Sequence, residues 1–148
     1  MPAQPPTADA DCDVVVMYAR ADRTWARATL IALLEQRAVH VCAEELAPEL
    51  DQPRRLALEK LVSTGHYIAP VLTPRFPAGG FAVMELALAR RLPPTQDTTG
   101  VIPIVREHCE MPISLQMLVS LDMTRDDDAA PAVDRLARAL HRPPPASQ

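Results

Sequence analysis

The fold is decided by the stretch DVVVMYARAD, residues 13–22. It opens with an unbroken apolar run, Val14 to Met17, which is typical of a strand buried on both faces of a sheet. Asp22 follows as a good helix N-cap, and apolar residues then recur at helical spacing up to Leu34. Arg37 suits the carboxyl end of this helix, where a positive charge is favourable. The stretch therefore predicts one unit of strand, loop and helix.

The same alternation continues along the rest of the chain. We expect further strands at residues 39–42, 67–72, 101–105 and 118–121, and helices at residues 53–63, 81–91 and 132–141. An acidic loop, residues 43–52, would follow the second strand, and Gly79 and Gly80 would form a flexible turn before the helix at residue 81. Strands that alternate with helices imply right-handed crossovers and a parallel sheet with helices on both faces.

The composition is that of a single globular domain. At 148 residues and 48% hydrophobic content, the chain can bury a core of its own. A net charge of -4 gives the chain no overall positive potential that would attract nucleic acid or an anionic membrane. No apolar run reaches the roughly 18 residues of a membrane span. Residues 1–10 and 142–148 carry too little hydrophobicity to pack, so we expect two mobile tails around a domain at residues 11–141.

The three cysteines, Cys12, Cys42 and Cys109, are odd in number and lack CxxC spacing. This pattern indicates a reduced compartment rather than a disulfide framework, and we expect a cytoplasmic location because no signal peptide is visible. His40 and Cys42 share a strand face, but two ligands without a third do not favour zinc. Cys109 beside His108 lacks the orienting acid that a nucleophile and its base require.

Two later stretches join the first in a specific order. Residues 67–76 read as a buried strand and a loop, and Phe81, Ala82 and Glu85 follow in the next helix. Together with residues 13–22 they resemble the Toll/interleukin-1 receptor (TIR) domain. Its first motif has the form D-V-F-I-S-Y-S-x-x-D, and its later motif is an aromatic residue, then Cys, then Glu three positions on. The resemblance implies a flavodoxin-like three-layer α/β fold with a central, roughly five-stranded parallel sheet.

The activity that the resemblance implies depends on Glu85. TIR domains with enzymatic activity cleave the nicotinamide–ribose bond of NAD, with the glutamate in the helix after strand three as the key residue, and Glu85 matches that position. A carboxylate beside the ribose can stabilise an oxocarbenium-like transition state. The products would be nicotinamide and ADP-ribose or a cyclic relative. NAD is then a substrate, and neither a cofactor nor a metal is implied.

The remaining site residues lie on loops beyond the carboxyl ends of the strands, where ligands bind in such sheets. We expect substrate contacts from Tyr18, Ala19, Arg20, Asp22, Glu45, Leu46, Phe81 and Ala82. Arg20 would supply the cation that a dinucleotide needs, and Phe81 would stack on nicotinamide. The acidic loop departs from the family pattern, because carboxylates at positions 44, 45, 49 and 51 would repel a diphosphate.

Two functions remain open from the sequence. The first is an NAD-cleaving enzyme of bacterial defence or virulence, active as a homo-oligomer in which one subunit's loop after strand two completes the neighbour's pocket. The second is a non-catalytic module that binds other TIR domains through its loops and helix faces. A phosphoacceptor receiver shares the architecture, but its paired acids after strand one are not present. On composition alone, Glu85 could also be a solvated helix carboxylate.

Overall fold

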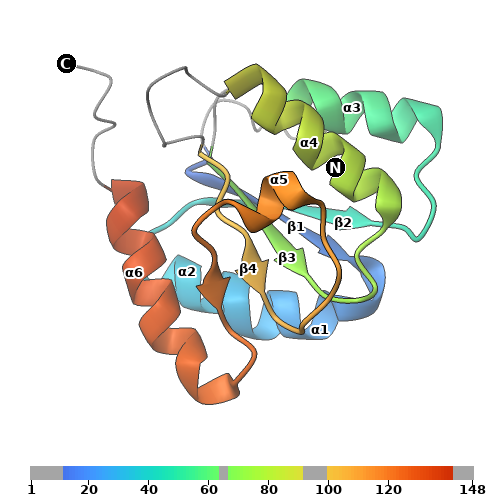
Figure 1. Ribbon diagram of the computed structural model, residues 1–148. Helices are drawn as coiled ribbons and strands as arrows, with labels where there is room; N and C mark the ends of the chain where they lie inside the picture. Colours follow the sequence, from blue (N-terminus) through green and yellow to red (C-terminus); the bar gives the residue numbers. More distant parts are fainter. Residues whose placement is uncertain (1–11, 64–66, 92–99, 142–148) are drawn as a thin grey trace, which may run out of the picture.

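The computed structural model describes residues 12–63, 67–91 and 100–141, and both expected tails lie outside them (Figure 1). Its centre is a five-stranded sheet with strand order β2-β1-β3-β4-β5, in which every pairing is parallel. The strands are β1 (Val14–Ala19), β2 (Val41–Leu46), β3 (Tyr67–Leu72), β4 (Ile104–Val105) and β5 (Leu121–Asp122). The predicted flavodoxin-like fold class is confirmed.

Helices cover both faces of this sheet (Figure 1). One face carries a helical segment over residues 20–36, and α6 packs beside it. That segment comprises a 3-10 turn (Arg20–Asp22), α1 (Arg23–Trp25), a π-helical stretch (Ala26–Ile31) and α2 (Ala32–Gln36). The other face carries α3 (Gln52–Val62), α4 (Ala78–Arg91) and the short α5 (Ile113–Gln116). A 3-10 turn (Asp126–Asp128) leads into α6 (Ala129–His141).

Strand β1 supplies the middle of the core, because all six of its residues are buried. Successive side chains of a strand point to opposite faces of the sheet. Val14, Val16 and Tyr18 accordingly pack with the α1, α2 and α6 side. Val15 and Met17 pack with the α3 and α4 side. The unbroken apolar run that the sequence shows is thus explained by burial on both faces.

Strand β2 differs from its prediction. It was expected at residues 39–42, but it runs from Val41 to Leu46, so the loop that follows is residues 47–51 instead of 43–52. Two carboxylates that were assigned to the loop, Glu44 and Glu45, therefore lie on the strand. An edge strand can hold charged side chains when they find partners, and both of these do, as described below. Asp51 is the N-cap of α3, and its side chain accepts a hydrogen bond from the Arg54 amide.

The predicted two-glycine turn is also wrong, because α4 begins at Ala78 and includes both glycines. Their role is close packing. A Cβ on Gly80 would lie 2.8 Å from a ring carbon of Phe76 and 3.0 Å from Cδ1 of Leu46. A Cβ on Gly79 would lie 3.1 Å from Cδ1 of Leu50. The absence of side chains here lets the start of α4 approach the end of β2 and its loop.

The remaining elements follow the sequence with changes at their ends. The strand at residues 67–72 is confirmed. The strand expected at residues 101–105 is shortened to β4, with one isolated bridge between Val101 and Ile68, because Pro103 has no amide hydrogen to continue the ladder. The strand expected at residues 118–121 is displaced toward the carboxyl end, because β5 shares only Leu121 with the predicted range. Helix α5 has only four residues and was not predicted.

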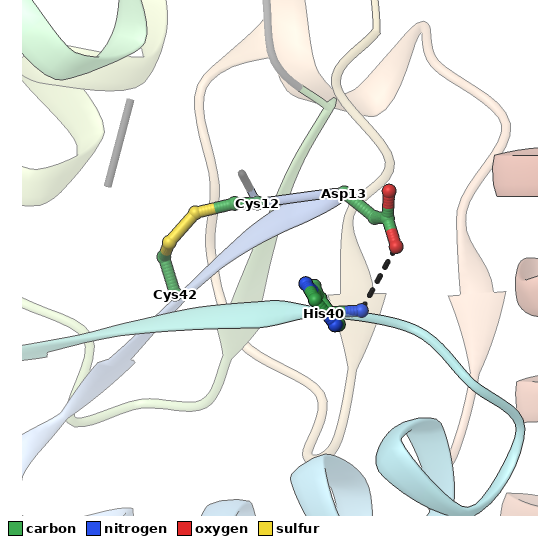
Figure 2. Close-up of a disulfide and its surroundings, with 4 residues drawn as sticks. All are labelled: Cys12, Asp13, His40 and Cys42. Carbon is green, nitrogen blue, oxygen red and sulfur yellow. Dashed lines mark hydrogen bonds between the residues drawn. A yellow bond between two sulfur atoms is a disulfide. The ribbon is translucent and has the colours of Figure 1, made fainter. Parts of the chain in front are cut away.

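Cys12 and Cys42 form a disulfide at the amino ends of β1 and β2 (Figure 2). Their Cα atoms are 5.7 Å apart, within the usual range for such a bridge. Beside them, the Asp13 amide donates to the His40 carbonyl at 2.8 Å, and the His40 amide donates to Oδ2 of Asp13 at 2.9 Å. The expectation of reduced cysteines is therefore wrong for this pair. Cys109 is free.

Candidate functional site

Asp22 ties three loops together at the carboxyl ends of the strands. Its buried carboxylate accepts hydrogen bonds from the Thr73 hydroxyl at 2.6 Å and from Nε of Arg75 at 2.8 Å. Arg75 also donates from Nη2 to Glu107 at 2.5 Å, and Glu107 and Asp22 together raise the pKa of Arg75. Asp22 occupies the predicted N-cap position, but its side chain makes no cap hydrogen bond. Its carboxylate instead joins the loops after β1, β3 and β4.

A second cluster surrounds Glu45, which lies opposite Tyr18 in the register of β1 and β2. Arg23 donates from Nε and Nη2 to the two carboxylate oxygens of Glu45 at 2.7 and 2.6 Å. The Tyr18 hydroxyl donates to the same carboxylate at 3.3 Å, and Nε of Arg20 lies 3.6 Å from it. Chiefly through the hydrogen bond from Arg23, the pKa of Glu45 is lowered to about 2. Burial raises the pKa of Tyr18.

Glu44 points to the opposite face of β2 and has a different partner. Its carboxylate lies 2.9 Å from Nη2 of Arg54, which also donates to the Glu45 carbonyl at 2.9 Å. The predicted repulsion of a diphosphate by four loop carboxylates therefore needs correction. Glu44 and Glu45 are on the strand and neutralised by arginines, and Asp51 caps α3. Only Glu49 remains an exposed loop carboxylate without such a role.

Glu85 is exposed on α4, on the side away from the core. Its neighbours Val83 and Met84 are fully buried. Phe81 lies one turn earlier on the same side of the helix as Glu85 and is half-buried against Phe76, with the ring centroids 4.8 Å apart. No hydrogen bond or ion pair joins Glu85 to the residues that the structure describes. Its carboxylate is thus open to a ligand.

The loop after β2 approaches this part of α4. Leu46 is fully buried beneath Gly80, and Leu50 lies against Gly79. The structure therefore brings together Leu46, Phe81 and Ala82, three of the expected substrate contacts, around the first turns of α4. Ala19, at the end of β1, is buried, and Arg20 directly after it is exposed.

The expected site residues divide between the two faces of the sheet. Tyr18 and its partner Glu45 belong to the face covered by α1. The helix that carries Glu85 packs on the opposite face. A ligand that touches both groups must therefore pass over the carboxyl ends of the strands. Sequence reasoning did not identify Arg23, since only the register of β1 and β2 places Glu45 beside the start of α1.

Two hollows in the described surface are lined by other residues. One, of about 550 Å³, lies between Cys109, Glu110, Met111 and Gln116. The other, of about 470 Å³, lies beside the disulfide and includes Glu35 and His40. Glu85 lines neither hollow. Burial and the nearby Glu107 raise the pKa of Cys109, which disfavours the thiolate.

The described residues hold neither a metal-binding cluster nor a membrane-spanning helix. Within residues 12–63, 67–91 and 100–141, no three His, Cys, Asp or Glu side chains are grouped so as to bind a metal ion. In the same segments, no helix has the length and apolar character needed to cross a bilayer.

Comparisons with known proteins agree with the fold. The family profile described as TIR domain matches residues 14–137. No curated protein matches the chain significantly. Among solved structures, the chain is similar to the crystal structure of the TIR domain of the Toll-related receptor TRR-2 from the lower metazoan Hydra magnipapillata. The two are 21% identical with a TM-score of 0.64, and the match covers 89% of this chain and 100% of that one. At this identity the likeness shows the fold alone.

Proposed function

Since the chain belongs to the TIR domain family, we propose that it cleaves the nicotinamide–ribose bond of NAD, with Glu85 as the catalytic residue. The observation that carries this proposal is that the Glu85 carboxylate is exposed and has no arginine partner among the described residues. Asp22, Glu44, Glu45 and Glu107 are each engaged by an arginine at the carboxyl ends of the strands. Glu85 is exposed, has no such partner among the described residues, and shares a helix face with the half-buried Phe81.

The chemistry needs one well-placed carboxylate. As the bond between ribose C1′ and the nicotinamide nitrogen breaks, its electron pair neutralises the pyridinium, and positive charge develops on the ribose. A negative charge beside the ribose stabilises that transition state. Water then adds to C1′ and loses a proton, which gives ADP-ribose, or a hydroxyl or nitrogen of the same molecule adds to give a cyclic product. Phe81 offers an aromatic face for the nicotinamide ring.

A second subunit would complete this site. Glu85 lies on an open helix surface and lines neither of the two hollows described above, whereas electrostatic stabilisation of this kind is strongest in a site closed off from bulk solvent. We propose that a neighbouring copy covers the α4 face, so that the active form is a homo-oligomer. A role in bacterial defence or virulence is part of the same proposal, and so is a cytoplasmic location, although the Cys12–Cys42 disulfide is more typical of an oxidising compartment.

The test is incubation of concentrated protein with NAD, followed by chromatography for nicotinamide. The wild type should release nicotinamide, and Glu85→Gln should reduce the rate by a factor on the order of 10² to 10³. Glu35→Gln is the matched control, because Glu35 is also an exposed helix carboxylate but lies on α2. Both variants should unfold at the wild-type temperature. A folded Glu85→Gln protein with unchanged turnover would refute the assignment.

A non-catalytic interaction module is the second candidate, and one observation favours it. Ile113, Met117 and Val119, on and after α5, are 73%, 79% and 87% exposed. Exposed apolar side chains that gather in one place are typical of protein-interaction surfaces. If no nicotinamide is released at any protein concentration, and replacement of these three residues by serine abolishes binding to other TIR domains, the second candidate replaces the first.

A further inference from the structure

Three arginines gather around Glu45 and Tyr18 at the carboxyl end of β1. Arg23 binds Glu45 through two hydrogen bonds of 2.7 and 2.6 Å, and Arg20 lies 3.6 Å from the same carboxylate. Arg27 lies over the Tyr18 ring, with its guanidinium carbon 5.9 Å from the ring centroid. The Tyr18 hydroxyl in turn donates to Glu45.

The charges of this cluster do not balance. Two guanidinium groups contact the Glu45 carboxylate and a third lies over the adjacent Tyr18 ring, although the chain as a whole has a net charge of -4. The nearest other acids have partners elsewhere. Glu44 points to the opposite face of β2 and pairs with Arg54, and Asp22 is bound by Arg75. With three guanidinium groups and one carboxylate, the cluster therefore has an excess of positive charge.

The geometry of the cluster suits an oxyanion larger than a carboxylate. A guanidinium group presents two parallel N–H donors, and this fork binds phosphate oxygens as well as it binds carboxylate oxygens. The side chains of Arg20 and Arg23 are 59% and 56% exposed, so a ligand in solution can reach both. Glu45 is 23% exposed and remains at the cluster as its resident anion.

We propose that Arg20, Arg23 and Arg27 form a binding site for a diphosphate group, and that Glu45 occupies this site in the free protein and must be displaced. The site stands on the arginine cluster alone. Its assignment to the diphosphate of NAD rests on the proposed function. Because the cluster and Glu85 lie over opposite faces of the sheet, the ligand that joins them is extended, with its diphosphate on the α1 side and its ribose on the α4 side.

Adjacent residues of β2 provide a matched test. Inorganic pyrophosphate is titrated into the full chain at low salt, and binding is measured by calorimetry. Replacement of Glu45 by Gln keeps the shape but removes the competing charge, so Glu45→Gln should bind pyrophosphate about three- to fivefold more tightly than wild type. Glu44→Gln removes the neighbouring charge from the opposite face and should change the affinity by less than about twofold. Arg23→Gln added to Glu45→Gln should abolish the gain.

Three results would overturn the site. The first is that the wild type and Glu45→Gln bind pyrophosphate with equal affinity. The second is that Glu44→Gln and Glu45→Gln gain affinity equally, and the third is that the gain of Glu45→Gln persists when Arg23→Gln is added. If Glu45→Gln does not fold, the single variants Arg20→Gln and Arg23→Gln test the site instead. Each should bind pyrophosphate more weakly than the wild type. Pyrophosphate binding and NAD cleavage can be measured separately. A protein that binds pyrophosphate as described but never releases nicotinamide keeps the site and loses the enzymatic function.

Discussion

Removal of the Cys12–Cys42 disulfide should lower the free energy of unfolding substantially. The bridge joins residues 30 positions apart. In the chain-entropy treatment, a closed loop of that length stabilises the folded state by about 3.6 kcal/mol at 25 °C, because it restricts the unfolded chain. For a domain of this size, the loss corresponds to a fall of about 7 to 14 °C in the unfolding temperature.

Thermal unfolding followed by circular dichroism checks this value. The double variant Cys12→Ser/Cys42→Ser and the wild type in excess reductant should unfold at the same lowered temperature. Cys109→Ser is the control, and it should respond to reductant as the wild type does, since Cys109 is free. Thiol counting in denaturant should detect one thiol in the oxidised protein and three after reduction. Three thiols without reductant, or an unfolding temperature that reductant does not change, would refute the reasoning.

Three other outcomes are expected. Since the pKa of Glu45 falls from 4.5 in its unperturbed state to about 2 in the fold, its stabilising contribution is present above pH 4.5 and is lost as the pH falls toward 2. Urea unfolding between pH 7 and pH 3 should therefore show a steeper loss for the wild type than for Glu45→Gln, and parallel curves would contradict this. Gly80→Ala should destabilise the protein by about 1 to 3 kcal/mol because its Cβ meets Phe76 and Leu46, whereas Gly79→Ala meets only the flexible Leu50 and should be nearly neutral in the same assay. Specific NAD-cleaving activity should rise with protein concentration if a second subunit completes the site, and constant activity over about a hundredfold dilution of a protein that stays monomeric by light scattering would exclude that arrangement.

The central strands could be predicted because their sequence carries the signal of burial. Val14 to Met17 and residues 67–72 are apolar without interruption, which is typical of strands buried on both faces. Edge strand β2 was harder to predict. Glu44 and Glu45 look like loop residues until Arg54 and Arg23 are placed beside them, and neither arginine is adjacent in the sequence. Charge pairs made by tertiary structure leave no local pattern.

The glycines and cysteines were misread for a related reason. Glycine serves both in turns and at tight helix contacts, and only the positions of Phe76 and Leu46 show which use Gly80 has here. Cys12 and Cys42 pair because the tertiary structure brings the residue before β1 beside the start of β2, with the two Cα atoms 5.7 Å apart. An odd cysteine count gave no indication of this. The motif spacing predicted the position of Glu85 on the helix after β3. The exposure of its side chain could not be predicted, because it depends on how α4 packs against the sheet.

The two edges of the sheet restrict how this chain can associate with others. Unpaired strand edges invite pairing with another sheet, which leads to aggregation. At one edge, β5 has only two residues and offers few backbone groups. At the other edge, β2 is longer but carries Glu44 and Glu45, and an added strand would have to pack beside their ion pairs. Strand addition is therefore disfavoured at both edges. An ordered assembly of this domain would use side-chain surfaces, such as the apolar residues around α5, and would keep the sheets of its subunits separate.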